Sequence, residues 1–389
     1  MTDLLIAGGC LALVLSLLGL ERFAIDRIRA RIPLRIAVTG TRGKTSVVRL
    51  IAAGLREDGL RILAKTTGSE ARVILPDGTE EPVRRRGVPT PLEQRGMLRW
   101  AARLACDAIV IEAMSIRPES LRAELGQILR PHTVVVTNTF EDHLAEMTDP
   151  AAVFSDAVPA GAMALLPSDF PASEQARLAK RSVPYRVIAT ESGEDRALRL
   201  PHPEWPQNLA LALAACERAG VGSETALRGM AGVRMDVGVL GAWILPDPVS
   251  GAAAWTAING FAANDPHSAL MALQRALAEW PKDGGGVVGL LNLRPDRADR
   301  TAQWMEGLRA FDGTVCGLVV CGSVPRIVRH RLARTYGKRV SVVVSKDPER
   351  IMDAVVRLCP EGGYVFGCGN IGGAGIRLVE YWQEKGEPA

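Results

Sequence analysis

The segment that most constrains the fold of this chain is residues 40–46, GTRGKTS, which directly follows the apolar run of residues 36–38. A strand, a glycine turn, a Lys-Thr pair and a helix in this order direct backbone N–H groups and a helix N-terminus toward one anion. This pattern predicts a phosphate-binding loop, with Lys44 on the terminal phosphates and Thr45 on Mg²⁺. The GxxGKTS spacing is shorter than the usual GxxxxGK[ST], and the alternative interpretation is an ordinary buried strand-turn-helix.

The rest of the chain predicts an α/β protein with two domains. A length of 389 residues exceeds what one typical core supports. The apolar strand before the loop, the helix expected over residues 44–57 and a second strand form a βαβ unit. A second alternation of strands and helices begins after residues 232–248, which are rich in Gly, Pro and Asp. We therefore expect an ATP-binding central domain over residues 33–240 and a smaller Rossmann-like domain over residues 241–389.

Acidic and polar side chains follow two further predicted strands. Glu112 ends the apolar run AIVIE, and the next strand runs into Asn138 and then Asp142-His143. The carboxyl edge of a parallel sheet is where ligands of open α/β folds bind. Glu112 is therefore a candidate Mg²⁺ or catalytic ligand, although an ordinary strand-end acid is equally compatible with the pattern. His143 could hold a second metal or orient a phosphate.

The N-terminus carries an apolar stretch, residues 4–20, without any charge. Its length is at the lower limit for a membrane-spanning helix. Five arginines follow within residues 22–35 and no Lys or Arg precedes it, so the positive-inside rule places the body of the protein in the cytoplasm. We expect residues 1–32 to form an uncleaved membrane anchor and connector at the cell membrane; a buried helix or a signal peptide is the alternative.

Composition and charge argue against nucleic-acid binding and against a cysteine metal site. Apolar residues make up 47% and charged residues 23%, as in an ordinary enzyme, and a net charge of +4 over this length does not favour nucleic acid. The seven cysteines lack metal-site spacing and are interpreted as reduced thiols. Two arginine groups, residues 84–86 and the set Arg294, Arg297 and Arg300, could contact an acidic ligand, or in the first case form a solvated turn.

Taken together, the loop, Glu112 and the cluster from Asn138 to His143 resemble the central ATPase domain of the Mur-type amide ligases, which include folylpolyglutamate synthetase. Further motifs, in order, are similar to the ligase subunit of poly-γ-glutamate synthase, the capsule B (CapB) family. These motifs are KTTG at 65–68, EDH at 141–143, NGFAAND at 259–265, an Arg-Asp-Arg pattern at 294–300 and GNIGG at 369–373. The resemblance covers nearly the whole chain.

This resemblance implies an ATP-dependent ligase that joins glutamate into poly-γ-glutamate through an acyl phosphate, with ATP and Mg²⁺ as cofactors and other membrane subunits as partners. It implies that Lys44, Glu112 and His143 are catalytic, and that Thr45, Glu112 and His143 hold metal. The implied nucleotide-binding residues are Gly40, Thr41, Arg42, Gly43, Lys44, Thr45, Ser46, Asn208, Arg234, Asn264 and Asp265.

The sequence also departs from the Mur pattern. No lysine occurs between Lys65 and Lys180, so the carbamoylated lysine with which many Mur ligases bind a second metal has no counterpart. We also expect no separate domain for a nucleotide-sugar substrate before the ATPase domain, which disfavours a UDP-linked substrate. Two other functions remain open: a membrane-anchored P-loop kinase or regulatory NTPase, and a non-catalytic scaffold with a vestigial loop. Glutamate-dependent ATP turnover separates the ligase from both.

Overall fold

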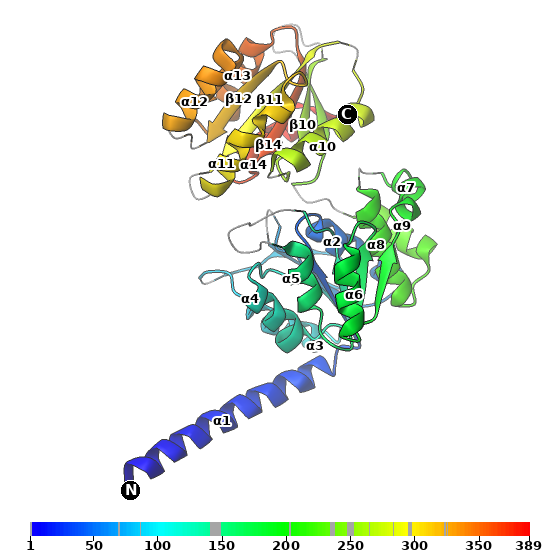
Figure 1. Ribbon diagram of the computed structural model, residues 1–389. Helices are drawn as coiled ribbons and strands as arrows, with labels where there is room; N and C mark the ends of the chain where they lie inside the picture. The colour runs from blue at the N-terminus through cyan, green and yellow to red at the C-terminus, as the bar shows by residue number, and fades with distance from the viewer. Residues whose placement is uncertain are drawn as a thin grey trace. The chain divides into compact units, whose positions relative to one another are not determined.

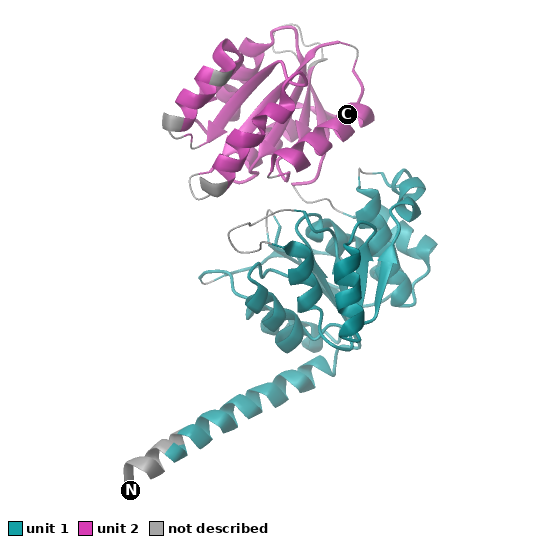
Figure 2. Ribbon diagram, in the orientation of Figure 1, with its two compact units in different colours: residues 1–234 teal, residues 235–389 magenta. Residues whose placement is uncertain are grey.

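The chain folds into two compact units, Met1–Arg234 and Met235–Ala389, shown in Figures 1 and 2. The structure is a computed structural model that describes residues 2–68, 71–85, 87–140, 149–201, 204–233, 238–246, 253–263, 265–282, 284–294, 298–322, 324 and 326–389. Each unit is built around its own sheet, and no strand pairs between the two sheets in these described ranges.

The first unit contains an eight-stranded sheet in the order β4-β3-β2-β5-β1-β6-β7-β8. The six strands from β2 to β8 in that order are parallel, whereas β3 pairs antiparallel with both β2 and β4. The turn at Asp77-Gly78 joins β3 to β4 as a hairpin. The strands are β1 (Leu34–Thr39), β2 (Ile62–Lys65), β3 (Arg72–Ile74), β4 (Glu80–Pro82), β5 (Ala108–Glu112), β6 (Thr133–Val136), β7 (Met163–Pro167) and β8 (Tyr185–Ile188).

Helices cover both faces of this sheet, because its central strands are apolar on both sides. One face packs against α2 (Lys44–Glu57), α8 (Pro206–Arg218) and α9 (Ser223–Ala231). The other face packs against α3, the α4–η1 segment, α5, α6 and the end of α1. The remaining bounds are α3 (Glu93–Arg103), α4 (Pro118–Ala123), the π-helix η1 (Glu124–Leu129), α5 (Pro150–Ala157), α6 (Ala172–Lys180) and α7 (Glu191–Ala197).

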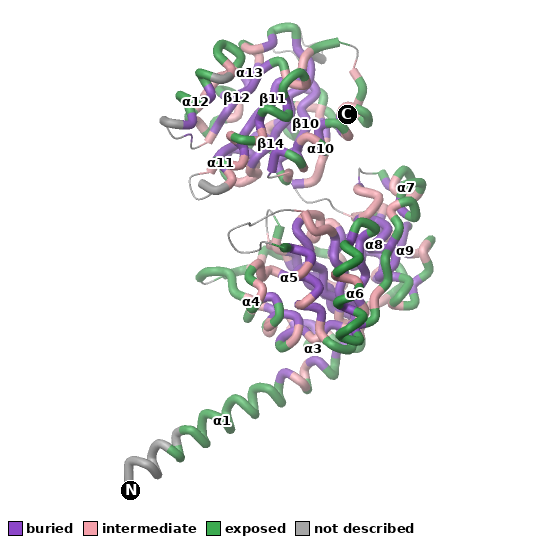
Figure 3. The backbone as a smooth tube through the Cα atoms, in the orientation of Figure 1, coloured by how far each residue is buried: buried purple, intermediate pink, exposed green. Residues whose placement is uncertain are grey.

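Helix α1 (Thr2–Arg29) is one continuous helix and spans most of residues 1–32, the predicted anchor and connector. Only its last turns are buried, at Ile25 and Arg29, whereas the side chains described between residues 11 and 23 are exposed (Figure 3). Among the residues whose side chains the structure describes, no helix combines the length and the apolar character that crossing a membrane requires. The structure therefore does not support the predicted anchor helix.

The second unit holds a seven-stranded sheet in the order β13-β12-β11-β14-β10-β9-β15. Strands β10 to β14 are parallel, and two antiparallel strands, β9 and then β15 at the edge, which the sequence did not reveal, extend the sheet beyond β10. One of these, β9, lies within the predicted domain junction. The strands are β9 (Ala242–Pro246), β10 (Ala253–Asn259), β11 (Gly286–Leu293), β12 (Gly317–Gly322), β13 (Val340–Val343), β14 (Gly363–Gly369) and β15 (Glu387–Pro388).

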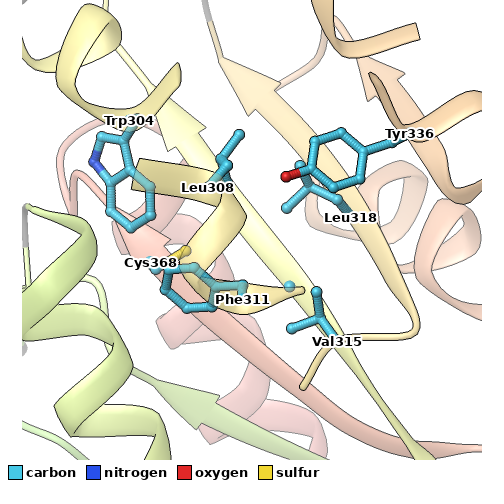
Figure 4. Close-up of a pocket in the computed structure, with 8 residues that line it drawn as sticks. Trp304, Leu308, Phe311, Val315, Leu318, Tyr336 and Cys368 are labelled. Carbon is cyan, nitrogen blue, oxygen red and sulfur yellow. The ribbon is translucent and has the colours of Figure 1, made fainter. Parts of the chain in front are cut away.

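The second sheet is also covered on both faces. One face carries α10 (Pro266–Glu279), α11 (Ala298–Gly307), the 3-10 turn η2 (Leu308–Phe311) and α12 (Arg326–Tyr336). The other carries α13 (Pro348–Leu358) and α14 (Ala374–Lys385), and the 3-10 turn η3 (Gly337–Arg339) follows α12. Side chains from Trp304 to Cys368 surround an apolar cavity of about 10 Å³ in the first of these layers (Figure 4). That volume holds at most about one water molecule, so the cavity is a packing gap.

Candidate functional site: a phosphate-binding loop at the sheet switch point

The loop of residues 40–46 follows β1 at the point where the strand order of the first sheet reverses. From β1 the chain first moves to β2 and β5 on one side, and then crosses to β6 on the other. The carboxyl ends of β5 and β6 therefore flank the loop: Val38 is in register with Glu112, and Thr39 with Val136. Loops diverge at such a position and leave a crevice, which is where open α/β sheets bind ligands.

Two glycines of the loop are required by its backbone path. Gly40 has φ +128°, and a Cβ there would lie 2.1 Å from Thr137 Oγ1. Gly43 has φ +74°, and a Cβ there would lie 2.7 Å from Asn208 Oδ1. Both φ angles are positive, in the range that residues with a side chain disfavour. At both positions, neighbouring atoms occupy the space that a Cβ would need. The short spacing of the motif thus produces a tight turn that leads directly into α2.

Lys44 and Thr45 open α2, whose first turn contains no acidic side chain. The Lys44 ammonium donates to the carbonyl oxygens of Gly40 at 2.7 Å and Thr41 at 3.3 Å, so it folds back over the loop. Thr45 Oγ1 donates to Glu112 Oε2 at 2.9 Å. The positive end of the helix dipole, the ammonium and a hydroxyl-carboxylate pair therefore converge at one edge of the sheet.

Glu112 is a buried carboxylate, only 2% exposed. Its hydrogen-bond partners are neutral donors: the Thr45 hydroxyl and the Thr67 backbone N–H, the latter at 2.7 Å. An anion buried without a basic side chain is costly, and a cation bound beside it relieves that cost. Glu112 and Thr45 thus fit the oxygen ligands that Mg²⁺ takes from a protein, the other positions being filled by phosphate and water.

Across the described ranges, no group of three or more His, Cys, Asp or Glu side chains is arranged as a metal site. His143 and the rest of the EDH motif lie outside the described residues, as do Arg234 and Asn264. Their predicted roles stay predictions.

A second strand-end group holds the loop in shape. Asn138 Oδ1 accepts from the Arg42 backbone N–H at 3.0 Å, and its Nδ2 donates to the Arg42 carbonyl at the same distance. The Thr137 hydroxyl donates to that carbonyl too, and Thr41 Oγ1 donates to Asn138 Oδ1. Asn138, which the sequence places at the same rim as Asp142 and His143, thus binds the backbone of the loop.

Behind Glu112 lies a buried polar network that sequence analysis missed. Lys65, with no exposed surface, donates to Glu93 Oε2 at 2.9 Å and to Gln94 Oε1 at 3.2 Å. Gln94 Nε2 donates in turn to Glu124 Oε1 at 2.7 Å. Burial lowers the pKa of Lys65, against the opposing effect of Glu93 and Glu124. The KTTG motif at 65–68 was the one sign of these contacts in the sequence. Its Lys65 belongs to the buried network, and its Thr67 binds Glu112.

The other predicted site residues fall in different places. Asn208, in the first turn of α8, lies against Gly43 and donates to Glu204 Oε1 at 3.0 Å. Ser46 follows Thr45 in the first turn of α2. Asp265 belongs to the second unit, where its carboxylate caps α10 by accepting from Ser268 N at 2.8 Å. The structure thus brings Asn208 to the loop, whereas the carboxylate of Asp265 caps a helix of the second unit.

The arginine groups also separate. Arg85 is paired with Glu93 at 2.8 Å, Arg84 is exposed, and Arg86 and Arg297 lie outside the described residues. In the second unit, Asn292 Nδ2 donates to the carbonyl of Gly372 at 2.9 Å, and a Cβ at Gly372 would lie 2.7 Å from Arg294 Nη1. The Arg-Asp-Arg pattern and the GNIGG motif therefore meet at one edge of that sheet. Arg300 lies on α11.

Comparison with known proteins agrees with this geometry. The Mur ligase middle domain family matches residues 38–194, and the poly-gamma-glutamate synthase CapB C-terminal domain family matches residues 248–385. The capsule biosynthesis protein CapB of Bacillus anthracis is 31% identical over 373 residues, covering 91% of this chain and 77% of the relative. The PGA synthase CapB of Bacillus subtilis (strain 168) is 28% identical over 390 residues, covering 97% and 96%.

Among solved structures, the bifunctional folylpolyglutamate synthase/dihydrofolate synthase from Yersinia pestis, complexed with AMPPNP and a Mn ion, superposes with a TM-score of 0.65. It is 17% identical and the match covers 93% of each chain, so it confirms the predicted two-sheet fold. The fold and the loop define an ATP-dependent amide ligase of the Mur type. Within that class, the chain belongs to the CapB family of poly-γ-glutamate synthases.

Proposed function

We propose that this ligase polymerises glutamate into poly-γ-glutamate through an acyl-phosphate intermediate. In this reaction a substrate carboxylate attacks the γ-phosphorus of ATP, which gives an acyl phosphate and releases ADP. The amine of the next glutamate then attacks the acyl carbon, forms the amide and releases phosphate. The observation that carries the proposal is the convergence of Lys44, Thr45 and Glu112 at the phosphate loop of a CapB-family chain.

Each of these residues has a distinct task in the proposed reaction. The loop amides and the α2 N-terminus bind the phosphates, and Lys44 exchanges its two carbonyl partners for the terminal phosphate oxygens. Thr45 and Glu112 would hold Mg²⁺, which neutralises the charge that develops during phosphoryl transfer. Asn138 keeps the loop in its binding conformation throughout, because it holds both the N–H and the carbonyl of Arg42.

We also propose a location at the cell membrane, with other membrane subunits of a capsule-type synthase as partners. The support is the exposed apolar surface of α1 between Leu11 and Phe23. This proposal requires α1 to reach a bilayer and does not depend on its spanning one. Vesicle flotation of the full chain, compared with a chain lacking residues 2–23, measures it; equal flotation would contradict it.

The function is tested by glutamate-dependent ATP turnover. The full chain, assayed with its membrane partners, ATP, Mg²⁺ and isotope-labelled glutamate, is expected to yield ADP and amide-linked glutamate detectable by mass spectrometry. Lys44→Ala should lower turnover by roughly 10²–10³-fold, because it removes a charge aimed at the transferring phosphoryl group. Lys180→Ala, at an exposed lysine on α6, is the matched control and should leave turnover unchanged.

The other outcomes identify the competing functions. ATP turnover that does not depend on glutamate would indicate a kinase or regulatory NTPase. Polymer formation that survives Lys44→Ala would indicate a scaffold with a vestigial loop.

A further inference from the structure

A second polar pocket opens at the opposite end of β1 from the phosphate loop. It lies where the end of α1 meets the starts of β1 and β6, and its volume is about 380 Å³. We call it the base pocket; its charged and titratable lining residues are Asp26, Arg29, Arg35, Arg130 and His132. Nothing in the ligase reaction uses these residues, because the loop and Glu112 lie at the other edge of the sheet.

The base pocket has an excess of positive charge. Three guanidinium groups line the pocket with a single carboxylate, Asp26, which pairs with Arg29 at 2.7 Å and Arg130 at 3.2 Å. Burial, followed by repulsion from Arg29 and Arg130, lowers the pKa of Arg35. Burial, followed by repulsion from Arg35 and Arg218, lowers the pKa of His132 as well. An anion placed here would relieve this repulsion.

Hydrogen bonds in the base pocket leave donors without acceptors. His132 Nδ1 accepts from the Arg35 backbone N–H at 3.1 Å, so the neutral ring carries its proton on Nε2. That nitrogen lies 3.3 Å from Arg35 Nη2, which is also a donor. In addition, Arg29 is only 4% exposed, and its Nε has no hydrogen-bond partner. An anionic oxygen between such donors is the acceptor that they lack.

The base pocket is also rigid. Arg35 Nε donates to the carbonyls of Leu129 and Arg130, and its Nη1 donates to those of Arg29 and Ile32, each at 3.0–3.2 Å. The guanidinium plane is therefore fixed before any ligand arrives, and a ligand pays little entropy to order it.

The exposed apolar residues of α1 that precede the base pocket indicate which anion it binds. Phe23 and the apolar side chains that precede it on α1 are exposed, and Asp26 and Arg29 follow three and six positions later on the same helix. At 1.5 Å per residue, the pocket begins roughly 5–9 Å beyond this apolar surface. The headgroup layer of a bilayer is of similar depth, roughly 5–8 Å on each side. We propose that the base pocket binds the phosphate of an anionic phospholipid headgroup.

Vesicle binding by the full chain tests this proposal. Phosphatidylcholine vesicles containing phosphatidylglycerol should bind more tightly than vesicles of phosphatidylcholine alone. Arg130→Gln should weaken binding to the anionic vesicles by about fivefold, and Arg29→Gln by at least as much. Arg228→Gln, an exposed site on α9, removes the same charge elsewhere and should change little. Arg130 is partly exposed, so its variant keeps the experiment informative if Arg29→Gln fails to fold.

Competition separates the possible ligands. Short-chain phosphatidylglycerol should displace the chain from vesicles, whereas inorganic phosphate and soluble poly-γ-glutamate should not do so at equal charge concentration. Equal loss of binding in Arg228→Gln, or displacement by phosphate or polymer as effective as by the lipid, would overturn the proposal. Glutamate-dependent ATP turnover in detergent should be unchanged in Arg130→Gln, so a failure of this inference is distinguishable from a failure of the proposed reaction.

Discussion

At the scale of single residues, the site depends on side chains that are absent as much as on those that are present. Gly43 combines a left-handed backbone with contact to Asn208, whereas Gly220 has a similar φ of +89° and open space around its Cα. Substitutions at these two positions therefore distinguish the effect of backbone strain from the effect of crowding against Asn208. Crowding at Gly43 would push either the loop or Asn208 out of place.

We expect Gly43→Ala to lower ATP turnover by roughly 10²-fold, because a shift of about 1 Å in a reacting group has that effect. Gly220→Ala should keep near-normal turnover. Both variants should lose about 1–2 kcal/mol of folding stability, because alanine is strained at a positive φ. Steady-state kinetics and thermal unfolding of both variants measure this. Comparable kinetic losses in the two proteins would show that strain, and not the contact with Asn208, determines the effect.

A second residue-scale prediction concerns Glu112. Glu112→Gln keeps the shape and can still accept from Thr45 and Thr67, but it loses the negative charge. We expect the Mg²⁺ concentration required for half-maximal turnover to rise by about tenfold or more, with little change in the unfolding temperature. A Mg²⁺ titration checks this. Glu80→Gln is not a suitable control, because Glu80 pairs with buried Arg49. Exposed Glu224→Gln serves instead, and an identical Mg²⁺ response in both variants would contradict the role of Glu112.

Residue roles were predictable from sequence where they follow from position next to a strand. Lys44, Thr45 and Glu112 were found because the glycine spacing and the apolar runs mark the ends of β1 and β5. The backbone contacts of Thr67 and Asn138 were not found, because they depend on which strands are neighbours. Strand order results from long-range packing and leaves no periodic signal in the sequence.

At the scale of elements, the network on α3 and η1 supports the strand that carries Glu112. Burial raises the pKa of Glu93, but hydrogen bonds from Arg85 and Lys65 outweigh it, so that this pKa lies below its usual value of 4.5. A carboxylate with a depressed folded-state pKa stabilises the fold above pH 4.5. That stabilisation is lost as the pH falls through the folded-state pKa.

Glu93→Gln is therefore expected to lower the free energy of unfolding at pH 7 by roughly 1–3 kcal/mol, since buried Lys65 loses its charged partner. The difference from the wild-type protein should narrow as the pH falls below 4.5. Denaturant titrations between pH 3 and pH 7 measure both effects. Glu224→Gln, which breaks an exposed pair with Arg199, should change little at any pH. A constant difference across the pH range would exclude the charge of Glu93 as the cause.

Element-level prediction succeeded where periodicity was strong and failed for the two antiparallel strands at one end of the second sheet. The parallel strands of both sheets were expected from their apolar runs, whereas β9 and β15 were not. Edge strands such as β15, with only Glu387 and Pro388, are too short to show an alternating pattern. The π-helix η1 was also missed, since its residues have the composition of an ordinary helix.

At the scale of the whole molecule, each unit has two apolar cores, one on each face of its own sheet. A unit with its own core and a complete sheet is able to fold alone. We expect residues 238–389, expressed separately, to unfold in one cooperative transition. Calorimetry and circular dichroism measure this, with the full chain as reference. A fragment that shows no cooperative transition would mean that the second unit needs the first in order to fold.

The short connection between α1 and β1 determines which way the first unit faces. Helix α1 ends at Arg29 and β1 begins at Leu34, and the six residues of β1 carry the chain roughly 20 Å to the phosphate loop. Whatever α1 is attached to is thus at the opposite edge of the sheet from the loop. Attachment through α1 therefore keeps the phosphate loop at the end of the first unit that points away from the point of attachment, a whole strand length from it.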